Sequence, residues 1–290
     1  MNYYSLIRND DNKKHYLYLY NKAIRCIGSI IIPLYYIITF WCHKKIINET
    51  ETIISLTSFG KRLSTVWITI ESLLRQKDNY CNIHLYVARN DSSVRIPFKK
   101  HMEKNGVEIH YVEDLKSFKK FYFAAKEYGD KNIITVDDDV IYPNYLTSSL
   151  IDAIREQNCV CCFRCHKITI ENGIINKYDE WNEVKDGMIR NMYFLPTGVG
   201  GVIYPKKYFC KELLNKELFM EMMPTADDIW LRFWGIAKGV EVYKVKEEYK
   251  NWIAIRFTQK NRLGIINNGY SMNDLAIMNI VAYIGIDKLV

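Results

Sequence analysis

The sequence lacks most marks of a specialised architecture. Beyond residue 50 it has no internal repeat, low-complexity tract or obvious linker, so one domain is expected there. No nucleic-acid-binding signature is present. The eight cysteines include no second C-x-x-C pair at zinc-finger spacing, and neither their number nor their spacing suits a small disulfide scaffold. Reduced thiols and a position on the cytoplasmic side of the membrane are therefore expected.

The composition is that of a globular protein with an excess of basic residues. Of the 290 residues, 49% are hydrophobic and 25% are charged, which allows a sizeable core. The net charge is +7, and the Lys and Arg residues are spread along the chain. This balance suits a phosphorylated substrate or an anionic membrane surface, and we expect no nucleic-acid partner.

One long uncharged run lies near the N-terminus, from Cys26 to Cys42. Its 17 residues reach the lower end of the roughly 17–25 that a spanning helix needs. The run predicts a helix over 26–42 that spans a membrane, lies in its plane or packs on the domain. The expected organisation is an N-terminal segment, residues 1–48, followed by one catalytic domain, residues 49–290.

The most informative stretch runs from Ile133 to Pro143. Its apolar, β-branched start predicts a buried strand, which ends in Asp137, Asp138 and Asp139. Three adjacent carboxylates repel one another unless a cation neutralises them, and hard oxygen ligands suit Mg²⁺ or Mn²⁺. A solvated acidic turn is the alternative.

Strands and helices alternate around this stretch, which predicts a mostly parallel α/β sheet covered on both faces. His84 and His110 fall on alternating stretches and are expected to be strand-face residues rather than ligands. The loop Ser58–Arg62 suits a nucleotide or phosphate, although its basic side chains could equally be solvated. The predicted strands are 52–57, 83–88 and 107–112, and the predicted helices cover 63–74, 117–128 and 145–154.

Two later stretches carry further candidates. Tyr193–Pro205 places three glycines among apolar residues, which indicates either close backbone approach to a ligand or a tight bend. Thr225 could cap a helix that starts with Asp227 and Asp228. A carboxylate there, near a second acidic site, could act as general base toward a hydroxyl acceptor.

The cysteines of 159–166 form a separate group. Cys162–His166 fits the C-x-x-C-H pattern of haem attachment. A short buried strand is the favoured interpretation, because free cysteine packs as a small hydrophobe.

Taken together, these stretches resemble bacterial glycosyltransferases with the GT-A fold, of the polysaccharide-assembly type. The resemblance covers roughly residues 52–280. It rests on the motifs in five ranges: 54–58, 113–120, 134–143, 195–205 and 226–230.

The resemblance implies a GT-A-like, Rossmann-like fold and an inverting, metal-dependent sugar transfer in cell-surface polysaccharide synthesis. The implied donor is a nucleotide-sugar, and a UDP-sugar is the preferred choice. The implied acceptor is a hydroxyl of a glycan or of a lipid-linked molecule. Asp139 and Asp137 would bind Mn²⁺ or Mg²⁺, and Asp228, with Asp227 as competitor, would be the base. Nucleotide contacts would come from Thr57, Ser58, Arg62, Asp114, Lys120, Asp137 and Asp138, and the sugar and acceptor side would be formed by Gly200, Gly201, Trp181 and Trp230.

Three alternatives remain open at this point. Asp137–Ile141 nearly fits the nucleophile motif of haloacid-dehalogenase phosphohydrolases. A nucleotidyltransferase would also present carboxylates at a strand end. A membrane-associated sugar- or nucleotide-binding protein without catalysis would leave Asp227 and Asp228 without a role.

Overall fold

In the computed structural model, residues 15–40, 51–77, 81–185, 187–245, 252–256 and 272–289 are described. The predicted boundary between residues 48 and 49 lies outside these ranges, so the division into 1–48 and 49–290 stays a prediction.

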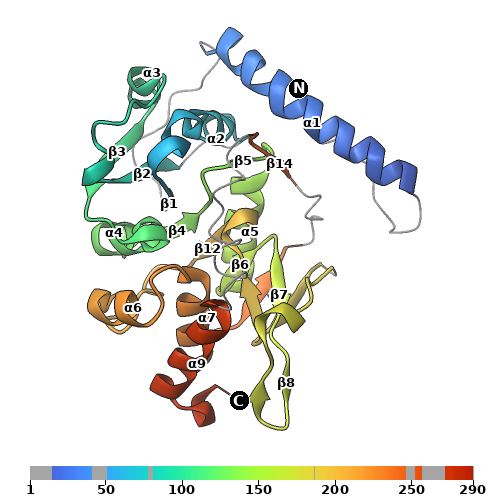
Figure 1. The fold of residues 1–290 in the computed structure, drawn as a ribbon, viewed down its shortest axis with the longest axis vertical. Helices are drawn as coiled ribbons and strands as arrows, with labels where there is room; N and C mark the ends of the chain where they lie inside the picture. The colour runs from blue at the N-terminus through green and yellow to red at the C-terminus, as the bar shows by residue number, and fades with distance from the viewer. Residues whose placement is uncertain are drawn as a thin grey trace.

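An eight-stranded sheet forms the centre of the chain (Figure 1). Four of its seven pairings are parallel, which confirms the predicted mostly parallel α/β fold. The sequence did not indicate that an antiparallel strand over 202–204 lies between the strands over 132–135 and 160–162. In spatial order the strands are β3 (Val107–Val112), β2 (Asn82–Ala88), β1 (Thr52–Ser58), β4 (Asn132–Thr135), β12 (Val202–Tyr204), β6 (Val160–Cys162), β13 (Val242–Lys244) and β10 (Ile189–Asn191).

Helices cover both faces of the sheet, because β1 buries side chains on both. Ile54 and Leu56 pack with the helices over 66–74 and 146–157, whereas Ile53 packs with the helix over 119–128 on the opposite face. The helices are α2 (Val66–Leu74), α3 (Lys99–Lys104), α4 (Lys119–Tyr128), α5 (Leu146–Gln157), α6 (Lys216–Met222), α7 (Asp227–Ala237) and α9 (Met272–Ile284), with 3-10 turns at Gly60–Ser64, Arg89–Asp91, Lys116–Phe118, Tyr178–Glu180, Gly198–Gly200 and Ile286–Lys288.

Small strand pairs complete the fold around this sheet. The pairs are β7 (Cys165–Lys167) with β11 (Phe194–Pro196), β5 (Val140–Ile141) with β14 (Ile253–Ala254), and β8 (Ile170–Glu171) with β9 (Ile174–Ile175).

Two local predictions were wrong. The stretch 159–166 is not one strand, because the chain turns at Phe163 and Arg164 and β7 leaves the main sheet to pair with β11. Its cysteines are buried thiols, as expected. Thr225 does not cap α7, since Ala226 holds the N-cap position and makes no side-chain hydrogen bond there.

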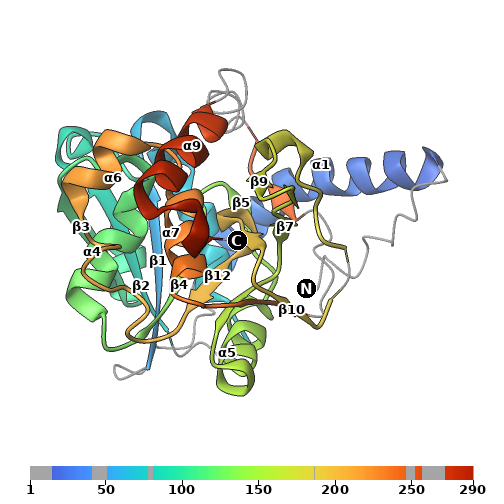
Figure 2. The ribbon, with the colours of Figure 1, turned by 90° about the horizontal axis from the view of Figure 1, so that it is seen from below.

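The N-terminal helix α1 (His15–Ile38) begins eleven residues before the predicted position and ends four before it. Its buried face carries Ile32 and Tyr36, which join the core beside α2. Arg75 fixes this contact, because its guanidinium stacks on Tyr36 and donates to the Thr39 carbonyl at 3.0 Å. The rest of α1 projects beyond the body of the domain (Figure 2).

The opposite face of α1 is apolar and exposed. Ile27, Ile30, Ile31, Leu34 and Ile38 are each about half exposed or more, and their spacing places them on one helix face. By length and composition the segment Tyr18–Ile38 could cross a membrane. Its most apolar 18 residues have a mean hydropathy of 1.2, and 28% of them are buried within the protein.

The buried position of Leu56 leads to a stability prediction. Leu56→Ala should lower the free energy of unfolding by about 2–5 kcal/mol, because it leaves a cavity in the central strand. Leu275→Ala on α9, where the side chain is 49% exposed, is the matched control and should cost much less. Urea unfolding followed by circular dichroism measures both, and equal losses would contradict the assigned core.

Candidate active site

A cavity of about 1300 Å³ opens at the carboxyl ends of β1 and β4. The two strands are adjacent and parallel, so the residues that follow them meet at one edge of the sheet. The first turn of α7 and the segment after β11 form the facing wall. Nine predicted site residues line the cavity: Thr57, Arg62, Asp114, Lys120, Asp137, Asp138, Asp139, Asp227 and Asp228.

Strand register explains the position of Asp138. Ser55 pairs with Thr135, so Ser58, three residues on, lies beside Asp138 and donates a hydrogen bond to its Oδ2. The Arg62 guanidinium contacts Asp138 Oδ1 and lies 2.8 Å from Asp139 Oδ2. Asp138 is only 5% exposed, and both of its oxygens are bonded to protein. These contacts give Asp138 a structural role, and its predicted contact with a nucleotide stays a prediction.

Lys120 joins the two walls of the cavity. Its Nζ lies 3.1 Å from Asp137 Oδ1 after β4 and 3.1 Å from Asp227 Oδ2 on α7. Burial alone would lower the pKa of this amine, but the surrounding carboxylates raise it well above its usual value. Lys120 is therefore a fixed internal cation.

Asp228 occupies the first turn of α7 and is partly exposed to the cavity. Its Oδ2 accepts a hydrogen bond from the Gly198 N–H at 3.3 Å. Burial in the protein, followed by repulsion from Asp227, raises its pKa to about 7. A carboxylate with this pKa can exchange a proton near neutral pH, as a general base requires.

The carboxylates at the end of β4 fit a divalent cation by their chemistry, since Mg²⁺ and Mn²⁺ prefer oxygen ligands. Asp137, about one-third exposed, and Asp139 flank the anchored Asp138 along the cavity wall. Asp139 could bind the ion only after the Arg62 guanidinium moves away from its carboxylate.

Two other predicted nucleotide contacts are tied to the protein. The Thr57 hydroxyl donates to the Tyr86 carbonyl at 2.8 Å. Asp114 accepts from Lys116 and Lys119 at 2.7 and 2.6 Å, and these bonds hold its pKa below the usual value despite partial burial.

The predictions for the sugar side were wrong in detail. Trp230 is fully buried and donates to the Leu213 carbonyl, while Trp181 is 4% exposed, so neither ring is available to stack on a sugar. Gly200 packs against Arg164, and a Cβ there would lie 2.6 Å from its Cβ. A Cβ on Gly201 would meet Leu146 of α5. Both glycines therefore serve packing.

Sequence reasoning missed four residues around the cavity. A Cβ on Gly198 would lie 2.6 Å from Asp137 Oδ1 and 2.8 Å from Lys120 Nζ, so glycine is what leaves room for that ion pair. Arg164, His166 and Tyr178 line the wall, and the Trp181 carbonyl lies 3.0 Å from His166 Nδ1. The glycine run pointed to this place, but no local signal distinguished Gly198 from its neighbours.

No family model matches the chain, and no curated protein is similar to it. Several solved structures share its general arrangement at low similarity. The 4-diphosphocytidyl-2C-methyl-D-erythritol synthase of Anaerococcus prevotii is 20% identical, with a TM-score of 0.47 over 76% of this chain and 96% of that one.

Two further similar structures are a cytidylyltransferase and a CMP-sugar synthetase. The 2-C-methyl-D-erythritol 4-phosphate cytidylyltransferase of Thermus thermophilus is 10% identical, with a TM-score of 0.43 over 79% and 98% of the two chains. CMP:2-keto-3-deoxy-manno-octonic acid synthetase, complexed with CTP, is 9% identical, with a TM-score of 0.43 over 67% and 89%. At these scores the likeness assigns no reaction to this chain, and none of the three is a glycosyltransferase.

The pKa of Asp228 predicts a pH dependence of stability. Up to about pH 7 the folded chain keeps a proton that an unfolded aspartate loses near pH 3.8. The folded state then binds more protons, so this contribution to stability is lost as pH rises between those values, on the order of 4 kcal/mol.

Asp228→Asn removes this contribution. The free energy of unfolding of the wild type minus that of the variant should therefore fall from about pH 4 to about pH 7 and stay level above. Urea titrations at each pH measure the difference, and a difference that does not change with pH would contradict the raised pKa.

Proposed function

We propose that this protein is a nucleotide-sugar-dependent glycosyltransferase that moves a sugar onto an acceptor hydroxyl. One observation carries the proposal: Asp228 on α7 faces the same cavity as Asp137 and Asp139 after β4. Under this proposal the diphosphate-binding groups and the proton acceptor belong to opposite walls of one site, an arrangement that suits an inverting displacement. A cavity of about 1300 Å³ is large enough for a nucleotide-sugar and part of an acceptor.

The chain's own residues have distinct roles in this proposal. A divalent cation, Mn²⁺ or Mg²⁺, held by Asp137 and Asp139 would neutralise charge on the diphosphate leaving group. Asp228 accepts the proton of the acceptor hydroxyl, which attacks the anomeric carbon from the opposite face. The ion pair with Lys120 occupies Asp227, so Asp228 is the better base of the two.

Nucleotidyl transfer is the second candidate. A nucleoside triphosphate substrate carries several negative charges, so basic groups beside the carboxylates would favour this reaction. The turn after β1 supports this candidate, because Gly60, at a φ of 49°, begins a 3-10 turn that contains Lys61 and Arg62. Two observations count against it. Arg62 already contacts Asp138 and Asp139, and nucleotidyl transfer does not need a proton acceptor at the position of Asp228.

Product analysis separates the two reactions. Nucleotide-sugars, UDP-sugars first, are screened by thermal shift with Mn²⁺ and with EDTA, and the best donor is then incubated with hydroxyl acceptors. Release of a nucleoside diphosphate supports glycosyl transfer. Release of pyrophosphate from CTP and a sugar phosphate would overturn it in favour of nucleotidyl transfer.

Asp228→Asn tests the assignment of the base. It should keep the donor-induced thermal shift and lose turnover by about 100-fold or more, because only proton transfer is removed. Asp152→Asn, at a side chain 68% exposed on α5, is the matched control and should leave turnover unchanged. Wild-type turnover by Asp228→Asn would refute its role.

We further propose that α1 lies in the plane of a membrane, on the cytoplasmic side. One face of the helix already packs on the domain through Ile32 and Tyr36, so lipid cannot surround it. The opposite apolar face would enter the bilayer, and the net charge of +7 favours anionic lipid. Arg25 and Ser29 of α1 also line the active-site cavity, which supports a lipid-linked acceptor presented at the membrane surface.

Liposome sedimentation tests this placement. The double variant Ile31→Glu with Leu34→Glu should reduce binding to phosphatidylserine-containing vesicles severalfold, because both side chains are about half exposed on the apolar face. Ile174→Glu on β9, at a side chain 69% exposed, is the control and should bind like the wild type. Cellular protein retained in membranes after alkaline carbonate would contradict an in-plane helix.

A further inference from the structure

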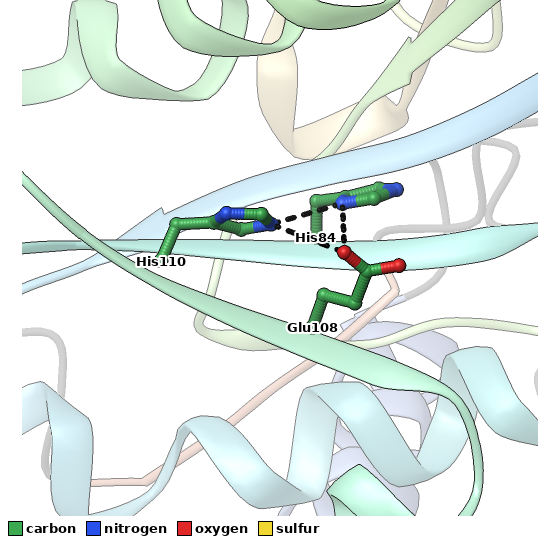
Figure 3. A group of neighbouring side chains, drawn as sticks. All are labelled: His84, Glu108 and His110. Carbon is green, nitrogen blue, oxygen red and sulfur yellow. Dashed lines mark hydrogen bonds and ion pairs between the residues drawn. The ribbon is translucent and has the colours of Figure 1, made fainter.

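Strands β2 and β3 bring three side chains of metal-binding types together, at a place separate from the active-site cavity. His84 on β2 is the register partner of Glu108 on β3, and His110 follows Glu108 by two residues on the same face. Figure 3 shows the three side chains converging. None of them lines the active-site cavity. Among the described residues this is the one group of three His, Cys, Asp or Glu side chains whose ligand atoms all lie within 4.8 Å of one another.

The distances between the ligand atoms match a bound zinc ion. His84 Nδ1 lies 3.1 Å from His110 Nε2, and Glu108 Oε2 lies 3.8 Å from each of these nitrogens. A point in their plane and equally far from all three is about 2.1 Å from each atom, and zinc binds histidine nitrogen at about 2.0–2.1 Å and carboxylate oxygen at about 2.0–2.2 Å.

Packing holds both rings in this arrangement. The His110 ring stacks on Tyr86 with centroids 4.8 Å apart, and the His84 ring lies 4.5 Å from that of Tyr128. The side chain of His84 is fully buried, whereas Glu108 is 51% exposed and His110 is 21% exposed. The ligands are thus positioned on a rigid sheet, and an ion and a water ligand can enter from solvent.

The donor set also suits a metal, because zinc binds imidazole nitrogen and carboxylate oxygen, and Glu108 supplies a compensating negative charge.

We propose that His84, Glu108 and His110 form a zinc site of the two-histidine, one-carboxylate type, separate from the active site. Because β3 is an edge strand of the sheet, the ion would cross-link this strand to its neighbour β2. A ligand that binds the folded chain alone raises its stability, so the site would stabilise this edge of the domain.

Cobalt spectroscopy on the full chain tests the site. The metal-free protein is titrated with Co²⁺ alone. A visible absorption band appears when four ligands hold the cobalt ion, so the band measures its binding at this site. In the wild type this band should saturate at one equivalent of four-coordinate Co²⁺. Glu108→Gln should weaken binding by about tenfold or more, and His110→Asn should abolish the band.

Two controls locate the effect. Glu103→Gln on α3, at a side chain 45% exposed, matches Glu108→Gln in chemistry and exposure and should bind like the wild type. Asp139→Asn should also leave the band unchanged, which separates this site from a cation in the active site. With zinc, amide hydrogen exchange should slow in β2 and β3.

Three results would overturn the proposal: no saturable binding by the wild type, a band unaffected by Glu108→Gln and His110→Asn, or a band lost with Asp139→Asn. Circular dichroism checks that each variant is folded. If His110→Asn unfolds, Glu108→Gln decides the question, because its exposed side chain can change without disturbing the core.

Discussion

The candidate active site depends on one buried cation. Lys120 lies between Asp137 and Asp227, which belong to opposite walls and are 90 residues apart in the chain. Without its charge these carboxylates, together with Asp228, would face one another with no compensation, and breaking a buried pair typically costs about 3–5 kcal/mol. The ion pairs therefore tie the first turn of α7, which carries Asp228, to the end of β4.

A second cation, Arg62, has the corresponding role within one wall. It neutralises Asp138 and Asp139, which otherwise repel each other after β4. A divalent ion would have to compete with this guanidinium for Asp139. Cation binding is thereby coupled to the position of the turn after β1, since Arg62 belongs to that turn.

The same sheet carries two groups of ligands with different chemistry. At the carboxyl ends of β1 and β4, oxygen ligands surround a large cavity, which suits a hard cation and a phosphate-bearing substrate. On β2 and β3, two imidazoles and one carboxylate converge on a face, which suits zinc. In the two proposals, the strand ends hold the site of the reaction, whereas the strand face holds a metal site that stabilises the fold.

Local patterns in the sequence determined the fold class, because hydrophobic periodicity and strand-end acids are local signals. β1, β2, β3 and α4 follow from such runs, and Asp137–Asp139 stood out as unpaired charge. Tertiary structure alone decided what depends on distant pairing: β12 between β4 and β6, the burial of Trp181 and Trp230, Gly198 as the glycine beside the ion pair, and the meeting of His84 with His110. Sequence spacing does not specify which strands become neighbours, and that choice set these contacts.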